Sequence, residues 1–114
     1  MKSIEIDPGI EADPSLLDPI RSGHQLFDAE LGRPAWKDFS AEWKLLHDDR
    51  GRPLVRLEIA DATDRVHAVY QADELDDPRR VKARLVWVVG DLLQIQSHRL
   101  LEKLQGATTD PEGN

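Results

Sequence analysis

The stretch from Pro78 to Gly106, PRRVKARLVWVVGDLLQIQSHRLLEKLQG, predicts one long helix and constrains how the rest of the chain is arranged. Asp76 or Asp77 supplies the N-cap, Pro78 suits the first turn, and Gly106 is the expected stop. A helix over 78–105 is about 40 Å long at ~1.5 Å per residue, whereas a seven-residue strand spans only ~23 Å. We therefore expect this helix to overhang its sheet by several turns.

Apolar residues form two stripes on this helix when it is wound at about 3.6 residues per turn. The first stripe dominates the amino-terminal half and contains Val81, Leu85, Val88, Leu92 and Ile95. The second lies about a quarter-turn away, reaches the carboxy end, and contains Val86, Val89, Leu93, Leu100 and Leu104. Because the two stripes cover more of the helix than one flat sheet can bury, we predict a homodimer whose interface is formed by Val89, Leu93, Leu100 and Leu104. The alternative is a helix that is shorter or frays beyond Ser97.

Three stretches before the helix, over 43–47, 54–60 and 65–70, have the composition of strands. In the second stretch, apolar Val55, Leu57 and Ile59 alternate with Arg56, Glu58 and Ala60. The sequences Asp48-Asp49-Arg50-Gly51 and Asp61-Ala62-Thr63-Asp64 lie between these stretches and have turn chemistry. The pattern predicts an antiparallel meander with one apolar face and one solvated face.

The amino-terminal third contributes less regular structure. Ile4 and Ile6 alternate with polar residues and permit a short edge strand. Asp18 followed by Pro19 predicts the start of a helix over 19–31. The fold class is therefore α+β, in two layers: an antiparallel sheet of three to four strands packed on a short helix and a long carboxy-terminal helix, in the order (β)αβββα. We expect a single domain over 1–105 and a disordered tail over 106–114.

The composition limits the class of protein. The chain has 114 residues, of which 39% are hydrophobic and 32% charged, and it contains no cysteine. No apolar run approaches the ~20 residues that span a bilayer, and the amino terminus lacks the apolar stretch of a secretory signal. Arginine outnumbers lysine by ten to five, which is typical of a GC-rich bacterial genome. We expect a bacterial, cytoplasmic protein that has no membrane partner.

The sequence contains no recognisable catalytic or metal-binding pattern. The four histidines lack the spacings typical of zinc ligands, and His24 is expected to lie partly buried beside Phe27. The paired aspartates lie in turn sequences, where their side chains bond to nearby backbone amides. The serines lie in no nucleophile-elbow context, and the glycines form no phosphate-binding loop. We therefore predict no catalytic residues, no metal and no cofactor, and a protein that is not an enzyme.

Two features of the long helix are candidates for binding a partner. Trp87 lies off both apolar stripes, and interfaces often use such a residue as an anchor; the alternative is that the amino-terminal third covers it. The second feature is the basic segment, which consists of Arg79, Arg80, Lys82 and Arg84. Cations in a first turn oppose the helix dipole, so the basic segment either binds phosphate or an acidic partner, or pairs with the preceding Asp73, Glu74, Asp76 and Asp77.

The order of elements is similar to two architectures associated with nucleic acid. Double-stranded RNA-binding domains have αβββα, and ribosome hibernation factors have βαβββα with a long final helix. This likeness, which concerns the fold alone, implies an RNA- or ribosome-associated stress factor that uses Arg56, Arg65 and the basic segment. The net charge of −7, with seven acids against two bases over residues 1–30, opposes binding to a polyanion. We therefore favour a non-catalytic protein-interaction module, such as an adaptor, small chaperone or regulatory subunit, that binds itself and a further protein partner.

Overall fold

The predicted long helix is present as α3, Pro78–Thr108, in the computed structural model, which describes residues 1–31 and 37–108. Its start is as predicted, because the Asp77 carboxylate accepts a hydrogen bond from the Arg79 N–H at 2.8 Å. The predicted stop at Gly106 is wrong: the helix continues through Gly106, and so residues 106–108 are not a disordered tail. Glycine weakens a helix by only about 1 kcal/mol, and Gly106 does not adopt the positive φ of a C-cap. Residues 109–114 lie outside the described residues.

The sheet has four strands in the order β1-β2-β3-β4: β1 Ser3–Ile6, β2 Ser40–His47, β3 Pro53–Ala60 and β4 Arg65–Gln71. The last three form the predicted antiparallel meander. β1 instead pairs with β2 in parallel, with Ile4 opposite Ala41, so the sheet is mixed and not antiparallel throughout. The reason is the helical connection between them, which returns the chain to the same end of the sheet before β2 begins.

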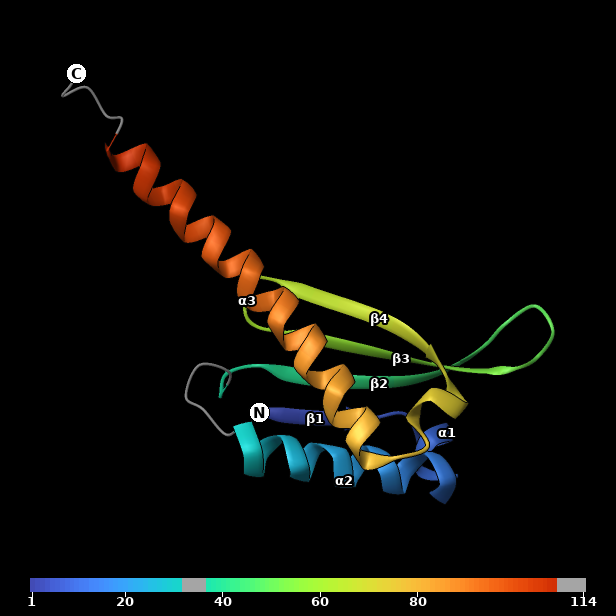
Figure 1. Ribbon diagram of the computed structural model, residues 1–114. Helices are drawn as coiled ribbons and strands as arrows, with labels where there is room; N and C mark the ends of the chain where they lie inside the picture. Colours follow the sequence, from blue (N-terminus) through green and yellow to red (C-terminus); the bar gives the residue numbers. More distant parts are fainter. Residues whose placement is uncertain (32–36, 109–114) are drawn as a thin grey trace.

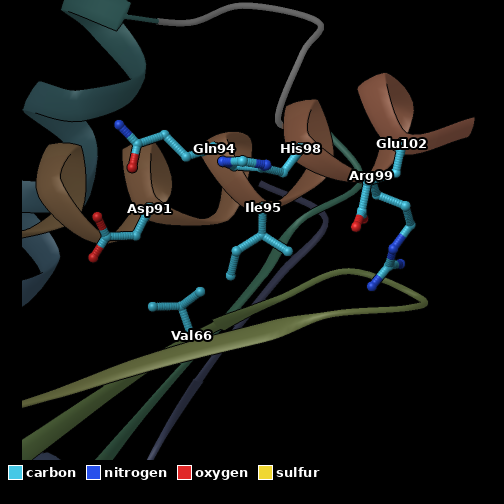
Figure 2. Close-up of a pocket in the computed structure, with 7 residues that line it drawn as sticks. All are labelled: Val66, Asp91, Gln94, Ile95, His98, Arg99 and Glu102. Atoms are coloured by element: carbon cyan, nitrogen blue, oxygen red, sulfur yellow. The ribbon is translucent and has the colours of Figure 1, made fainter. Parts of the chain in front are cut away.

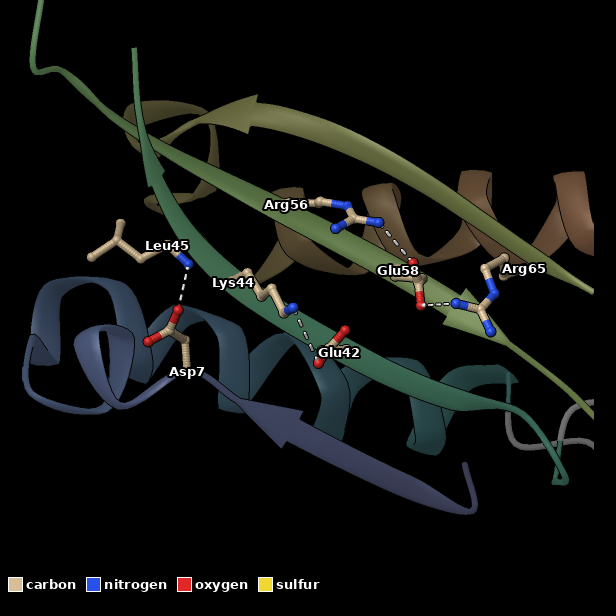
Figure 3. Close-up of polar contacts among 7 residues, drawn as sticks. All are labelled: Asp7, Glu42, Lys44, Leu45, Arg56, Glu58 and Arg65. Carbon is tan, nitrogen blue, oxygen red and sulfur yellow. Dashed lines mark hydrogen bonds and ion pairs between the residues drawn. The ribbon is translucent and has the colours of Figure 1, made fainter.

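Asp7 holds the edge strand β1 to the rest of the sheet (Figure 3). Its N–H donates to the Trp43 carbonyl at 2.9 Å. Its carboxylate accepts hydrogen bonds from the N–H of Gly9 at 2.9 Å and of Leu45 at 3.1 Å. Both bonds lower the pKa of Asp7 below its ordinary value, and the bond from Gly9 has the larger effect. One carboxylate therefore starts the short helix α1, Pro8–Glu11, and joins it to β2.

The two tight turns of the meander have the predicted chemistry. Asp48 Oδ1 accepts two backbone hydrogen bonds within its turn, at 2.8 and 2.9 Å, and Gly51 adopts the left-handed φ of 78° that the turn requires. Asp61 Oδ1 likewise accepts two backbone hydrogen bonds, at 2.7 and 2.8 Å. These aspartates are structural, as expected from their positions.

The helix predicted over 19–31 is longer than expected: it is α2, Pro14–Leu31. Asp13 precedes it and accepts hydrogen bonds from both the N–H and the hydroxyl of Ser15. Pro19 lies inside the helix and not at its first position. Proline removes one backbone hydrogen bond there, but Leu16 and Ile20 on the same turns are buried. Burial of two large apolar side chains is worth several kcal/mol and outweighs the local preference.

α2 and α3 pack on one face of the sheet, and the other face is open (Figures 1 and 3). The alternation predicted for β3 is confirmed, since its inward residues Val55, Leu57 and Ile59 are buried. On the open face, Glu58 pairs with Arg56 at 2.8 Å and with Arg65 at 3.8 Å. A short 3₁₀ helix, η2, Ala72–Leu75, connects β4 to α3.

Candidate interaction surface

α3 projects well past the sheet, as its length predicts (Figure 1). Gln96 contacts the Asp61 carboxylate and Arg99 contacts the Asp64 carboxylate, both in the turn between β3 and β4. The side chains of residues 100–106 are all exposed. The projection raises the radius of gyration to 17.3 Å, against ~13 Å for a compact chain of this length.

The two predicted stripes differ in burial. In the first stripe only Ile95 is exposed, and the other members are buried in the core. In the second stripe Val89 is buried within one chain (3% exposed) and Leu93 is half-buried against the core, whereas Leu100 and Leu104 are exposed. α2 covers this side of the helix near its start, where Lys82 Nζ lies 2.8 Å from Glu30 Oε1. Of the four predicted interface residues, Leu100 and Leu104 are thus exposed and Val89 is not.

The outward side of α3 carries a continuous apolar band, which we call the outer strip. It comprises Val86, Gly90, Leu93, Ser97, Leu100 and Leu104, flanked by Trp87 and Leu101. Trp87 is 71% exposed, and the three leucines beyond the sheet are 53–58% exposed. The described part of the amino-terminal third, residues 1–31 and 37–38, therefore does not fold over Trp87. Of the nine exposed large apolar residues in the described chain, three belong to the outer strip and two flank it, which shows that they are clustered and not scattered.

The sequence-based prediction of interface residues did not include Val86, Gly90, Ser97 and Leu101. A sequence signal for them exists, because members of the outer strip recur every seven residues. One set is Val86, Leu93 and Leu100, and the second set, four residues later, is Gly90, Ser97 and Leu104. This spacing is typical of the contact line between two helices. The second set contains the small residues Gly90 and Ser97, so a search for large apolar side chains alone does not find it.

The basic segment is largely neutralised within the chain. Arg80 pairs with Asp76 at 3.5 Å and Arg84 pairs with Glu74 at 3.3 Å, as the alternative of pairing with the preceding acids predicts. Lys82 pairs with Glu30, and Arg84 also lies over the ring of Tyr70. Arg79 is different: its backbone N–H donates to Asp77, and no ion pair of its side chain is found among the described residues. Paired cations attract a polyanion weakly, so these contacts weigh against a phosphate-binding role.

A groove of about 520 Å³ lies between the second half of α3 and the edge strand β4 (Figure 2). Ile95 points from the helix toward Val66 on β4, and charged residues, among them Asp91, Arg99 and Glu102, surround this apolar pair. His98 also lines the groove. Among the described side chains, no three histidines or acids are grouped so as to hold a metal ion.

His24 is the only buried polar side chain of the described core. Its Nε2 accepts a hydrogen bond from Trp43 Nε1 at 2.8 Å, which places the proton of the neutral ring on Nδ1. Burial lowers the pKa of His24 to about 4, and the carboxylate of Asp28 opposes this shift only in part. The ring is therefore neutral at pH 7 and joins α2 to β2. His24 was expected to be partly buried and is more deeply buried than that.

No protein-family model, curated protein or solved structure matches the chain significantly. No helix of the described residues is long and apolar enough to cross a bilayer. The function is therefore inferred from the geometry of the described surfaces, and above all from the outer strip.

Proposed function

We propose that the protein is a non-catalytic protein-interaction module that forms a homodimer through the outer strip of α3. The observation that carries the proposal is a band of large apolar side chains exposed on a rigid helix that stands clear of the body. Burying one leucine side chain fully is worth ~1.5–3 kcal/mol. An apolar patch of this kind is typical of a protein–protein contact.

A second copy is the partner that best suits this surface. Ser97 is the one polar residue of the outer strip, and Gln94 lies between the flanking Trp87 and Leu101; neither carries a charge. Of the charged residues in this stretch, Asp91, Arg99 and Glu102 lie on other sides of the helix, and Lys103 borders the strip on the side away from Trp87. Interface cores are depleted in charge, and most homodimers use one patch twice about a two-fold axis. An uncharged helical band presents no charge repulsion to its own copy.

The dimer leaves other surfaces free for a further protein partner. The open face of the sheet, with its paired Arg56 and Glu58, lies on the side of the sheet away from α3 (Figure 3). The proposal extends to a role as an adaptor, small chaperone or regulatory subunit in the cytoplasm of a bacterium. The composition, which has no cysteine and more arginine than lysine, supports the location and the source but does not bear on the role.

The oligomeric state in solution tests the proposal. We expect light scattering to give twice the chain mass for the wild type at high micromolar concentration. Leu100→Asp with Leu104→Asp should give a monomer. Both side chains are exposed, so the double variant should keep its fold, which circular dichroism will verify. Leu93 is unsuitable for substitution because it is half-buried in its own core.

Glu102→Lys is the matched control. It also changes the net charge by two units, at an exposed position on the side of the helix opposite the outer strip. This control should remain dimeric. A wild type that is monomeric at high micromolar concentration overturns the proposal, and so does a control that dissociates as readily as the leucine variant.

A further inference from the structure

We propose that the two α3 helices of this dimer run antiparallel about a two-fold axis that crosses the outer strip at the level of residue 95, so that each chain's Trp87 packs against the partner's Leu101. This inference rests on the proposed homodimer and specifies its geometry. Three properties of the residues in the outer strip support this geometry: their spacing, their size and their surroundings.

The seven-residue spacing defines a narrow seam. Side chains spaced by seven along an α-helix keep nearly the same direction, and two interleaved sets form the contact line of a helix pair. In the outer strip one set is entirely large (Val86, Leu93, Leu100), whereas the other begins with two small residues (Gly90, Ser97) and ends with Leu104.

Residue size favours an antiparallel pair over a parallel one. With the axis near residue 95, Leu100 lies opposite Gly90, Leu93 opposite Ser97, and Val86 opposite Leu104. Each small residue then receives a leucine, which is how facing layers interdigitate. A parallel pair would set Gly90 against Gly90 and Leu100 against Leu100, leaving a gap at one level and crowding at another. Gaps of this kind destabilise an apolar contact.

The surroundings of Gly90 provide an independent argument. A methyl group placed at Gly90 would meet no heavy atom within 4 Å, so the fold of one chain does not require glycine there. Gly23 is different, because the side chain of Val81 occupies the space beside it. Glycine weakens the middle of a helix relative to alanine. The open space beside Gly90 suits the side chain of a leucine from a second chain.

The flanking residues fit the same arrangement. Trp87 and Leu101 lie on one side of the seam and are fourteen residues apart. An antiparallel pair brings Trp87 opposite the partner's Leu101 at both ends and leaves Gln94 opposite its own copy at the axis. The two strips, each ~28 Å long and ~10–12 Å wide, project to about 600–700 Å² in total. Since this is less than a standard interface of ~1,600 Å², we expect dissociation in the micromolar range.

Disulfide trapping tests the direction of the helices, because the native chain has no cysteine. We would mix Val86→Cys and Leu104→Cys chains in equal amounts, one carrying a tag that separates the species on a gel, and oxidise them. The antiparallel pair predicts that the mixed species dominates, since a disulfide needs Cα atoms within about 7 Å. The two copies of a cysteine at 86 would then lie ~27 Å apart along the axis.

The outcomes separate this inference from the proposed function. A Val86→Cys chain that readily forms a disulfide with its own copy, or a sample that is dimeric by light scattering but forms no mixed disulfide, overturns the antiparallel register alone. A sample that is monomeric by light scattering overturns the homodimer and the register together.

Gly90→Leu gives a second test that does not depend on oxidation. The added side chain fills the space reserved for the partner's Leu100, so the dimer should weaken tenfold or more. The thermal unfolding of the monomer should not be impaired, because leucine is the better helix former. Gly106→Leu is the control, since a Cβ added at Gly106 likewise meets no heavy atom within 4 Å and Gly106 lies outside the outer strip. A Gly90→Leu variant that dimerises as tightly as the wild type would refute the register.

Discussion

Acidification should destabilise the fold through one buried residue, His24. Its ring contacts Trp43 edge to face, with 5.8 Å between the ring centroids. The Trp43 N–H donates to His24 Nε2, which can accept only while the imidazole is neutral. A protonated ring would place two donors against each other in the core, where a charge is poorly solvated. Burial therefore holds the pKa of His24 at about 4, below its ordinary value of 6.5.

The direction of the effect follows from linkage between protonation and folding. The unfolded chain takes up a proton at His24 as the pH falls through 6.5, whereas the folded chain resists until about pH 4. The stabilisation is therefore complete above pH 6.5 and is lost progressively as the pH falls toward 4. A difference of about 2.5 pKa units corresponds to ~3 kcal/mol, which is a large part of the 5–15 kcal/mol that typically stabilises a domain.

Urea denaturation between pH 7 and pH 4 measures this loss. The wild type should lose ~3 kcal/mol more of its free energy of unfolding over this range than His24→Gln does, because glutamine stays neutral and keeps an acceptor for Trp43. His67→Gln, at an exposed position on β4, is the control and should follow the wild type. The measurements belong in the Leu100→Asp, Leu104→Asp background, so that dimer dissociation does not contribute. Equal pH dependence of the wild type and His24→Gln would refute this account of the core.

Two further predictions follow from other parts of the chain. Gly23→Ala should destabilise the fold by ~1–3 kcal/mol in urea denaturation, because its new methyl carbon would lie 2.5 Å from Val81 Cβ; an unchanged midpoint would contradict the tight crossing of α2 and α3. RNA binding should be feeble even at low salt, and replacing Arg79, Arg80 and Lys82 with alanine should change it little, as measured by fluorescence anisotropy. Tight, salt-sensitive binding by the wild type would instead favour the RNA- or ribosome-associated function.

The meander and the long helix could be predicted because their signals are local. The period-2 pattern of 54–60 and the turns at Asp48 and Asp61 decide β3 and its neighbours without reference to the rest of the chain. The N-cap at Asp77 and more than twenty residues of helical periodicity likewise decide α3. The length of α3 alone then predicts its projection beyond the sheet.

The features that were predicted wrongly depend on contacts between distant segments. β1 is four residues long, and its own sequence does not indicate whether it pairs in parallel or antiparallel. Its direction is decided by its pairing with β2, more than thirty residues away. α2 begins at Pro14 because Leu16 and Ile20 find a core to bury against. Val89 is buried in the core cluster of its own chain, which the periodicity of α3 cannot reveal. The outer strip became visible only when the structure showed which apolar side chains stay exposed.

Sedimentation equilibrium of the unmodified protein, across concentrations from low to high micromolar, tests the central claim most directly. The outer strip predicts a reversible monomer–dimer equilibrium, in which the mean mass rises smoothly from one chain to two and no larger species forms. A mean mass that stays at one chain over the whole range would contradict the claim that α3 joins two copies of this protein.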